Sequence, residues 1–434
     1  MEQASKSSHG NVVNDPDVQR FLKRCAMPKA ASDVALAEHT VKPFSPVIPN
    51  PIRHIVAVDS GFTEVPVSSR FPSSTLAFFQ FGALSFSVAD LEGLAEQPFI
   101  APEDMAKLKH IERLKLTLPV RNIALSDQST LTGSVRVALL DFFAHQRDGT
   151  NLLETLRWFL FEEYQVPKGS YTLASCPECR TPEVPVYRNE VNSEGRFPCS
   201  SCKQMLMLTD VFRLHEAIDD GVGAGGILGY VTTLLEQFVM VHFLRLILAQ
   251  RPSLLKEVMF IKDGPLAFFG QTANMFSKMR TLATFLFDNH ALFMAGLEKS
   301  GAFVDHAAEV AGAMKDGSTL ILDNEYIYKY IIPGKADPKN PYGGTTYYSA
   351  KVIFKTPRGR VHVATLPTRR PLIMPQASDL PNLDTILTNI DKLRCDMYDD
   401  ALIPVALVNK LVSLANHPSS KILQRFAVDS VAIT

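Results

Sequence analysis

Two aspartates in this sequence each follow a short apolar run and stand one or two residues before a glycine. Asp59 follows the run 54–58, and Asp263 follows the run 258–262, after which the chain turns through Gly264 and Pro265. Runs this apolar are typical of strands that are buried on both faces of a sheet. If the two strands are neighbours, their terminal carboxylates converge and can hold a divalent cation on a phosphate substrate. The pattern therefore predicts a metal-dependent nuclease.

A third carboxylate, Glu236, lies in the segment 227–248, which is apolar almost all round a helix. An unpaired carboxylate in such surroundings is strongly unfavourable, so Glu236 needs a partner. That partner is either a metal ion or a cation of the chain, such as Arg245, His242 or a distant lysine. The sequence leaves both open, with Glu257 as a poorer substitute for Glu236.

A third apolar run, 291–297, ends in Glu298 and Lys299. A lysine beside a metal site can hold the scissile phosphate or orient the attacking water as a point charge. We therefore include Lys299 in the candidate catalytic set. The alternative is a surface lysine at the end of a strand.

Two C-x-x-C pairs stand 19 residues apart in the middle of the chain, Cys176 with Cys179 and Cys199 with Cys202. Four thiolates on two tight turns give the closed tetrahedral shell of a structural zinc site, and this spacing is typical of a zinc ribbon. A site with four cysteine ligands has no open position, so this zinc is expected to fold a module and do no chemistry. The alternative is a set of redox or disulfide cysteines.

A basic cluster with interleaved tyrosines follows in the C-terminal third of the chain. It indicates a nucleic-acid surface that combines phosphate contact with stacking, although such clusters are often only solvated faces. The residues in this prediction are Lys351, Lys355, Arg358, Arg360 and Tyr347.

The composition is that of a globular protein with a sizeable core. The chain has 434 residues, 46% of them apolar and 21% charged, and its formal net charge is -1. This charge gives no global attraction for nucleic acid, so DNA contact has to come from local clusters. No secretion signal opens the chain, which leads us to expect a cytoplasmic protein. The segment 227–248 is long enough to span a membrane, but Glu236, His242 and Arg245 favour a buried core helix.

The elements predicted from the pattern alternate between helices and strands. We expect a tail and linker over 1–49, a main domain over 50–166 and 209–434, and the zinc module over 167–208. Within the main domain, we expect a helix over 102–116, a strand over 325–332, and a β-hairpin over 347–365.

The order of these motifs resembles the NurA nuclease domain. The resemblance rests on Ala57-Val58-Asp59-Ser60-Gly61, on a helical glutamate before Ile261-Lys262-Asp263-Gly264-Pro265-Leu266, and on Gly296-Leu297-Glu298-Lys299-Ser300-Gly301. It also includes Pro404-Val405-Ala406-Leu407-Val408-Asn409-Lys410, which looks like the last helix of the family. Apart from the zinc insertion, it covers residues 50–434.

The resemblance implies an RNase H-like mixed sheet flanked by helices, and Mn²⁺- or Mg²⁺-dependent cleavage of DNA. It also implies a homodimer that works with a HerA-type hexameric ATPase in DNA end processing or defence against phage. Asp59, Glu236 and Asp263 match the metal carboxylates of the family, and Lys299 matches its lysine.

Two positions depart from the family pattern. Asn409 stands where the family usually has a histidine, and Ile403 where it has an aromatic residue. Asparagine cannot act as an acid or a base. The competing hypothesis is therefore a catalytically degenerate adaptor with an RNase H-like scaffold, which binds DNA or a partner ATPase through its zinc ribbon.

Overall fold

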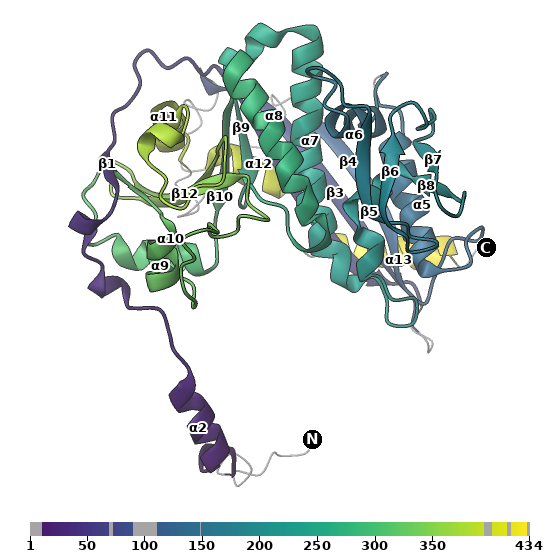
Figure 1. Cartoon of the computed structure of the whole chain (residues 1–434), viewed down its shortest axis with the longest axis horizontal. Coiled ribbons are helices and arrows are strands. Elements are labelled where there is room, and N and C mark those ends of the chain that lie inside the picture. Colours follow the sequence, from purple (N-terminus) through teal and green to yellow (C-terminus); the bar gives the residue numbers. More distant parts are fainter. Residues whose placement is uncertain are drawn as a thin grey trace.

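A nine-stranded mixed sheet forms the centre of the computed structural model, which describes residues 11–68, 73–89, 111–147, 149–394, 402–414 and 418–431 (Figure 1). The strand order within these residues is β1-β11-β12-β13-β10-β9-β2-β3-β4. The strands are β1 (Val41–Pro43), β2 (His54–Pro66), β3 (Thr75–Ser87), β4 (Ile111–Arg121), β9 (Val258–Asp263), β10 (Phe293–Glu298), β11 (Ser318–Ile321), β12 (Ser349–Lys355) and β13 (Val361–Pro367).

Five neighbouring strands have the order and directions of the RNase H-like fold. Strands β2, β3 and β4 are antiparallel and consecutive, β9 runs parallel to β2, and β10 runs parallel to β9. The two parallel connections each contain a helix, as a parallel crossover requires. The predicted fold class, an RNase H-like mixed sheet flanked by helices, is confirmed.

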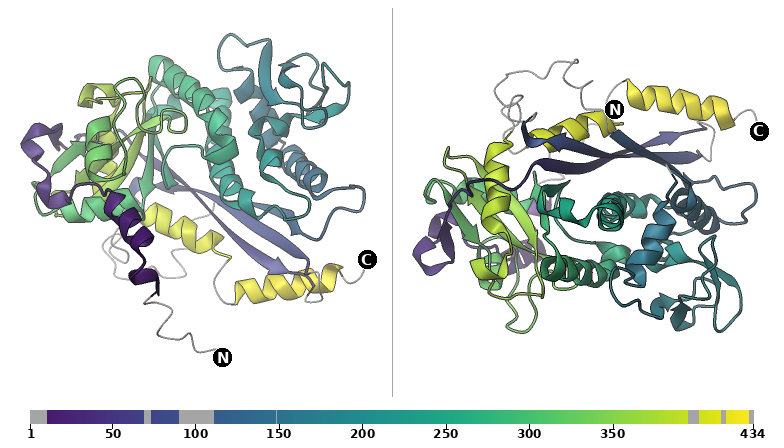
Figure 2. Two further views of the ribbon diagram at one scale, coloured as in Figure 1. Left: turned by 60° about the horizontal axis from the view of Figure 1, so that its bottom comes forward. Right: turned by 90° about the horizontal axis from the view of Figure 1, so that it is seen from above.

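Helices cover both faces of the sheet. One face packs against α5 (Leu131–Ala144), α6 (Leu152–Leu160), α7 (Leu228–Gln250) and α8 (Met275–Asn289), and the other against α11 (Leu383–Lys392) and α12 (Ile403–Val412). Figure 2 shows α12 and α13 (Ser419–Val431) on one side of β2 and β3, and α7 on the opposite side. The helices α9 (Ala302–Val310) and α10 (Asn324–Tyr330) build a third core with β11, β12 and β13. The N-terminal helix α2 (Pro16–Arg24) contributes no buried residue.

Alternation along β2 and β9 divides their side chains between the two faces. Val56 and Val58 belong to the core on the α7 side, whereas Ile55 and Ala57 belong to the core on the α12 side. On β9, Phe260 faces α7, and Met259 and Ile261 face α12. This alternation decides from which side each polar residue at the strand ends projects.

Helix α7 is apolar and long enough to cross a membrane by length and composition alone. In the structure it is a core helix, because twelve of its residues are buried, and it packs against β2, β3 and β9. The prediction of a buried core helix is confirmed.

The cysteine pairs lie in a small module that follows α6. It contains two short antiparallel sheets, β5 (Ser170–Ser175) with β6 (Pro182–Tyr187) and β7 (Arg196–Pro198) with β8 (Met205–Met207). Arg136 of α5 joins this module to the main domain. Its guanidinium donates to Glu178 of the module at 2.7 Å, and to both carboxylate oxygens of Asp210, just after the module, at 2.8 and 2.9 Å.

Three sequence predictions of local structure are wrong. The helix over 102–116 is contradicted from residue 111 onward, where the chain forms β4; residues 102–110 lie outside the described part. The strand over 325–332 is helix α10, which begins where the Asp323 carboxylate accepts a hydrogen bond from the amide of Tyr326. Within the tail over 1–49, Val41–Pro43 pairs with β11 and extends the main sheet.

Gly296 is required by the close packing of the sheet at the end of β10. A Cβ at this position would lie 2.5 Å from the carbonyl oxygen of Gly264 and 2.9 Å from the amide nitrogen of Leu266. We predict that Gly296→Ala lowers the free energy of unfolding by about 1–3 kcal/mol, because backbone atoms have to move.

The matched control is Gly229→Ala in the first turn of α7, where a Cβ meets nothing within 4 Å. This change is expected to raise stability by up to about 1 kcal/mol through helix propensity. Urea unfolding of both variants measures the difference. Equal stabilities would contradict the packing around Gly296.

Candidate active site and metal centre

Asp59 and Asp263 stand side by side where β2 and β9 separate. The parallel pairing of the two strands ends at Val58 and Lys262, and the next residue on each strand is an aspartate. Paired strands are about 5 Å apart, so the two aspartates are close neighbours. Beyond this point β2 continues to Pro66 beside β3, whereas the chain after β9 turns away at Gly264, which has a φ of 76°.

Asp59 is 3% exposed, and only one of its two carboxylate oxygens has a hydrogen-bond partner. Its Oδ1 accepts a hydrogen bond from the amide of Ser60 at 2.7 Å, whereas its Oδ2 is buried without a partner. Burial, together with the charges of Asp263 and Glu236, raises the pKa of Asp59 to about 7, against the opposing effects of Lys299 and of the Ser60 amide. A buried carboxylate oxygen with other carboxylates nearby is where a cation would be favourable.

Glu236 reaches the same strand ends from α7 and is 5% exposed. Its Oε2 lies 2.6 Å from the ammonium of Lys262, and its Oε1 accepts a hydrogen bond from the Ser60 hydroxyl at 2.5 Å. The partner that the sequence left open is therefore Lys262 in this structure. Of the other candidates, Arg245 pairs with Glu154 and His242 contacts the Thr155 hydroxyl.

Lys299 follows β10 and completes the group. Its ammonium lies 2.9 Å from Oδ2 of Asp263, and both side chains are partly open to solvent. The structure thus brings together the four residues Asp59, Glu236, Asp263 and Lys299, whose roles in the chemistry are proposed below. Glu257 precedes β9, at its opposite end, and pairs with Arg53 at 3.9 Å, so it is no substitute for Glu236.

The donor set at these strand ends fits a hard divalent cation. Carboxylate oxygens are the ligands that Mg²⁺ and Mn²⁺ prefer, and Oδ2 of Asp59 has no other partner. The carboxylates are not drawn together as tightly as the ligands of a preformed site. Among the described residues, only the cysteine quartet has all of its ligand atoms within 4.8 Å of one another. In this structure two of the carboxylates are paired with lysines instead, Glu236 with Lys262 and Asp263 with Lys299.

The helix α12, which contains the segment 404–410, packs against β2 and β3 beside Asp59. Cγ1 of Val412 would lie 2.5 Å from a Cβ on Gly82, the cross-strand neighbour of Asp59. Asn409 lies on the exposed side of this helix. Lys410, the next residue, is exposed as well.

The basic cluster predicted to bind nucleic acid does not form one open surface. Strand β12 lies inside the sheet, between β11 and β13. Lys351 is 3% exposed and pairs with Glu298, and Tyr347 is also buried. Lys355 pairs with Asp316 and donates to two carbonyl oxygens, and Arg358 lies in the exposed turn after it. The prediction is therefore wrong for Lys351 and Tyr347, which are buried. Lys355 is engaged in contacts within the protein.

A basic cleft that the sequence analysis missed lies along the edge strand β4. It has a volume of about 400 Å³, and its charged lining residues are Arg113, Lys115, Asp141, His145 and Arg147. Arg113 pairs across the sheet with Gly82, which pairs with Asp59, so the cleft begins two strands from the carboxylates. The alternation of Arg113, Lys115 and Thr117 with buried leucines was the available signal for this strand.

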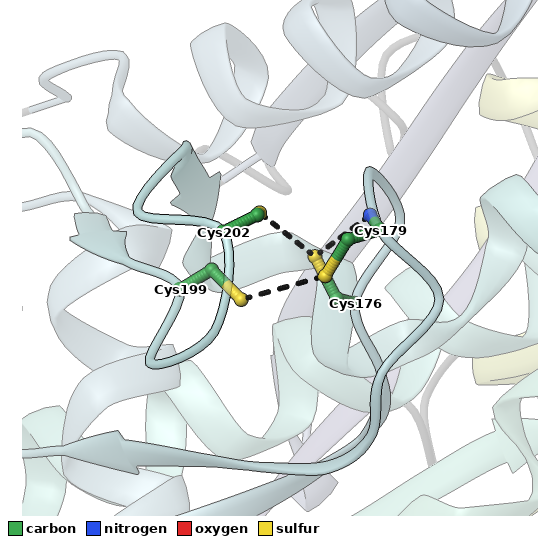
Figure 3. Close-up of side chains that lie close together, drawn as sticks. All are labelled: Cys176, Cys179, Cys199 and Cys202. Atoms are coloured by element: carbon green, nitrogen blue, oxygen red, sulfur yellow. Dashed lines mark hydrogen bonds between the residues drawn. The ribbon is translucent and has the colours of Figure 1, made fainter.

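The four cysteine sulfurs converge between the two knuckles of the inserted module (Figure 3). Sγ of Cys176 lies 3.9 Å from Sγ of Cys202, and Cys179 lies 3.9 Å from Cys199. This separation is too long for a disulfide, and it is close to the ~3.8 Å that four sulfurs have around a tetrahedral zinc ion. Backbone amides of Glu178, Cys179 and Ser201 donate to the sulfurs, which favours thiolates. The quartet could hold a metal ion.

No protein-family model and no curated protein matches the chain. Solved structures of NurA nucleases align along its length. The NurA nuclease from Sulfolobus solfataricus aligns over 99% of both chains with 9% identity and a TM-score of 0.35. A NurA structure with manganese covers 89% of this chain and 91% of its own with 12% identity and a TM-score of 0.29. A further NurA structure covers 99% and 98% with 10% identity and a TM-score of 0.31. The chain is thus similar along its length to NurA nucleases. TM-scores this low do not establish a common fold, and the function has to be inferred from the residues of this chain.

Proposed function

We propose that this protein is a divalent-metal-dependent deoxyribonuclease that hydrolyses phosphodiester bonds. The observation that carries the proposal is the buried Oδ2 of Asp59, which lacks a partner although Asp263 and Glu236 lie close enough to raise the pKa of the same carboxyl group. This arrangement is unfavourable for stability by itself. The arrangement becomes favourable when a bound cation neutralises the carboxylates, and buried carboxylates with a raised pKa are common at cation-binding and catalytic sites.

The proposed mechanism is in-line attack of water on the phosphodiester. Asp59 and Asp263 would hold Mn²⁺ or Mg²⁺, with Glu236 beside them. The bound ion supplies a lowered pKa of water and neutralisation of the developing phosphate charge. Lys299 lies at the partly open mouth of the site, where its ammonium can contact a phosphate oxygen and fix the orientation of the scissile bond. Arg113 and Lys115 of the β4 cleft would guide the DNA backbone toward the site.

The first test replaces Asp263 by asparagine, which keeps the size of the side chain and removes its charge. We predict that Asp263→Asn lowers the rate of cleavage of linear DNA with Mn²⁺ at least about a hundredfold, because several kcal/mol of transition-state stabilisation depend on the ion. Circular dichroism and size-exclusion chromatography are expected to show an unchanged fold.

The control is Glu257→Gln at the other end of the same strand, which should cleave at the wild-type rate. Full activity of Asp263→Asn would refute the assignment of the site. A wild-type protein that binds DNA and leaves it intact with Mn²⁺ would favour the adaptor hypothesis, which Asn409 supports because asparagine cannot transfer protons.

We further propose that the cysteine quartet binds a structural zinc ion. The support is the convergence of the four sulfurs, which all lie within 4.8 Å of one another, and the amide groups that donate to them. The purified protein is therefore expected to contain one zinc ion per chain. Cys199→Ser should lose it and become sensitive to proteolysis within residues 167–208, because zinc binding and folding of such a module are coupled.

Cys25→Ser is the matched control, since Cys25 is exposed and lies outside the quartet. Metal analysis of both variants measures the number of zinc ions per chain. Full zinc content in Cys199→Ser, or disulfides in the zinc-free wild type, would contradict the zinc assignment.

The resemblance of the motifs also leads us to propose that the protein forms a homodimer and works with a HerA-type hexameric ATPase in DNA end processing or anti-phage defence. The support for these points is the order of the sequence motifs alone. A cytoplasmic location is a separate proposal, which the resemblance does not carry.

A further inference from the structure

Lys262 is the most buried charged group at the candidate active site. The residue is 2% exposed, and it stands on β9 between Ile261 and Asp263. The ammonium lies 2.6 Å from Oε2 of Glu236 and donates to the carbonyl oxygen of Asp263 at 2.5 Å. A buried ammonium is tolerated only where such partners replace its water. The nuclease mechanism above gives this residue no role.

The contacts of Glu236 leave no free oxygen on its carboxylate. Oε2 meets Lys262, and Oε1 accepts from the hydroxyl of Ser60. The amide of Ser60 in turn donates to Oδ1 of Asp59. The four groups therefore form a continuous chain of contacts, Lys262 to Glu236 to Ser60 to Asp59, which ends at the buried Oδ2 that has no partner.

The two faces of the sheet separate Glu236 and Lys262 from the carboxylates of the two aspartates. By the alternation along β2 and β9, Ser60 and Lys262 project on the side of α7, where Glu236 lies. Asp59 and Asp263 project on the side of α12, where Ile55, Ala57 and Ile261 pack, and the ammonium of Lys299 lies 2.9 Å from Oδ2 of Asp263. Glu236 thus meets Lys262 on one side, and the two aspartates face each other on the other side.

The charges of the site favour a single divalent ion. Three carboxylates and the two ammonium groups of Lys262 and Lys299 lie close together. Two-ion sites hold their cations about 4 Å apart, and their four positive charges depend on carboxylates without ammonium partners. With both lysines in place, a second divalent ion would add to an excess of positive charge, whereas one ion nearly balances the site.

We propose that the ammonium of Lys262 supplies the positive charge that a second cation would otherwise bring to Glu236, so that this chain binds one catalytic ion between Asp59 and Asp263. Glu236 is then a positioning residue, which acts through Lys262 and Ser60. This inference rests on the proposed nuclease function.

The test is titration of Mn²⁺ into the full-length protein with its cysteine site loaded with zinc, followed by calorimetry and by the electron paramagnetic resonance signal of free Mn²⁺. The wild type is expected to bind one Mn²⁺ per chain. Lys262→Met removes the ammonium and keeps the length of the side chain, so Glu236 loses its counter-charge. This variant is expected to bind two Mn²⁺ ions and to show a melting temperature that is below that of the wild type and is restored by Mn²⁺.

Two further variants separate charge from packing. Lys262→Arg keeps the positive charge and should bind one Mn²⁺. The double variant Lys262→Met with Glu236→Gln removes both charges and should also bind one, which shows whether the second ion in Lys262→Met needs the Glu236 carboxylate. If Lys262→Met alone fails to fold, the number of ions bound by the wild type decides the test.

Two Mn²⁺ ions in the wild type would overturn the inference and leave the nuclease function standing. One ion in a folded Lys262→Met variant would likewise overturn it. A wild type that binds no Mn²⁺ outside the cysteine site would overturn both the inference and the proposed function.

Discussion

The burial of the Asp59 carboxylate at the point where β2 and β9 part is the constraint on which the site depends. The paired strands exclude water up to Val58 and Lys262, and the next residues are acidic. Ser60 satisfies one oxygen of Asp59 and leaves the other buried without a partner. Two lysines neutralise the neighbouring carboxylates, Lys262 for Glu236 and Lys299 for Asp263. Asp59 is the carboxylate that no cation of the chain contacts directly among the described groups.

The sheet also directs neighbouring charged residues to its two opposite faces. Because side chains alternate along each strand, one strand end can present Lys262 to α7 and Asp263 to the opposite face. Helix α7 is apolar almost throughout and buried, so the carboxylate of Glu236 is costly unless it is paired. The ion pair with Lys262 meets that requirement within the protein. Glu236 is therefore paired within the protein, whereas Asp59 and Asp263 are the carboxylates proposed to bind the catalytic ion.

The sequence predicted the parts of the site that depend on local pattern. Apolar runs that end in Asp59, Asp263 and Lys299 are readable because buried strands are continuous in hydrophobicity. Their adjacency followed from the resemblance to a known domain and from the assumption of one sheet. The partner of Glu236 was not predictable, because Lys262 stands within an apolar run and its direction depends on register.

The wrong predictions have equally physical causes. Lys351 and Tyr347 looked like a solvated surface, but β12 is an inner strand, so its basic residue is buried against Glu298. The segment that forms β4 was assigned to a helix although Leu114, Leu116 and Leu118 alternate with polar residues, which is the period of a strand. The tyrosine-rich segment of α10 has strand propensity, and the capping aspartate at its start was the opposing signal.

The central claim is that an ion binds between Asp59 and Asp263, and anomalous diffraction at the manganese edge from crystals soaked in Mn²⁺ tests it most directly. The account predicts one peak within coordination distance of Oδ2 of Asp59 and of the Asp263 carboxylate, with the Lys262 ammonium still on Glu236. An empty position between the two aspartates, with manganese only at the cysteines or on the surface, would contradict it.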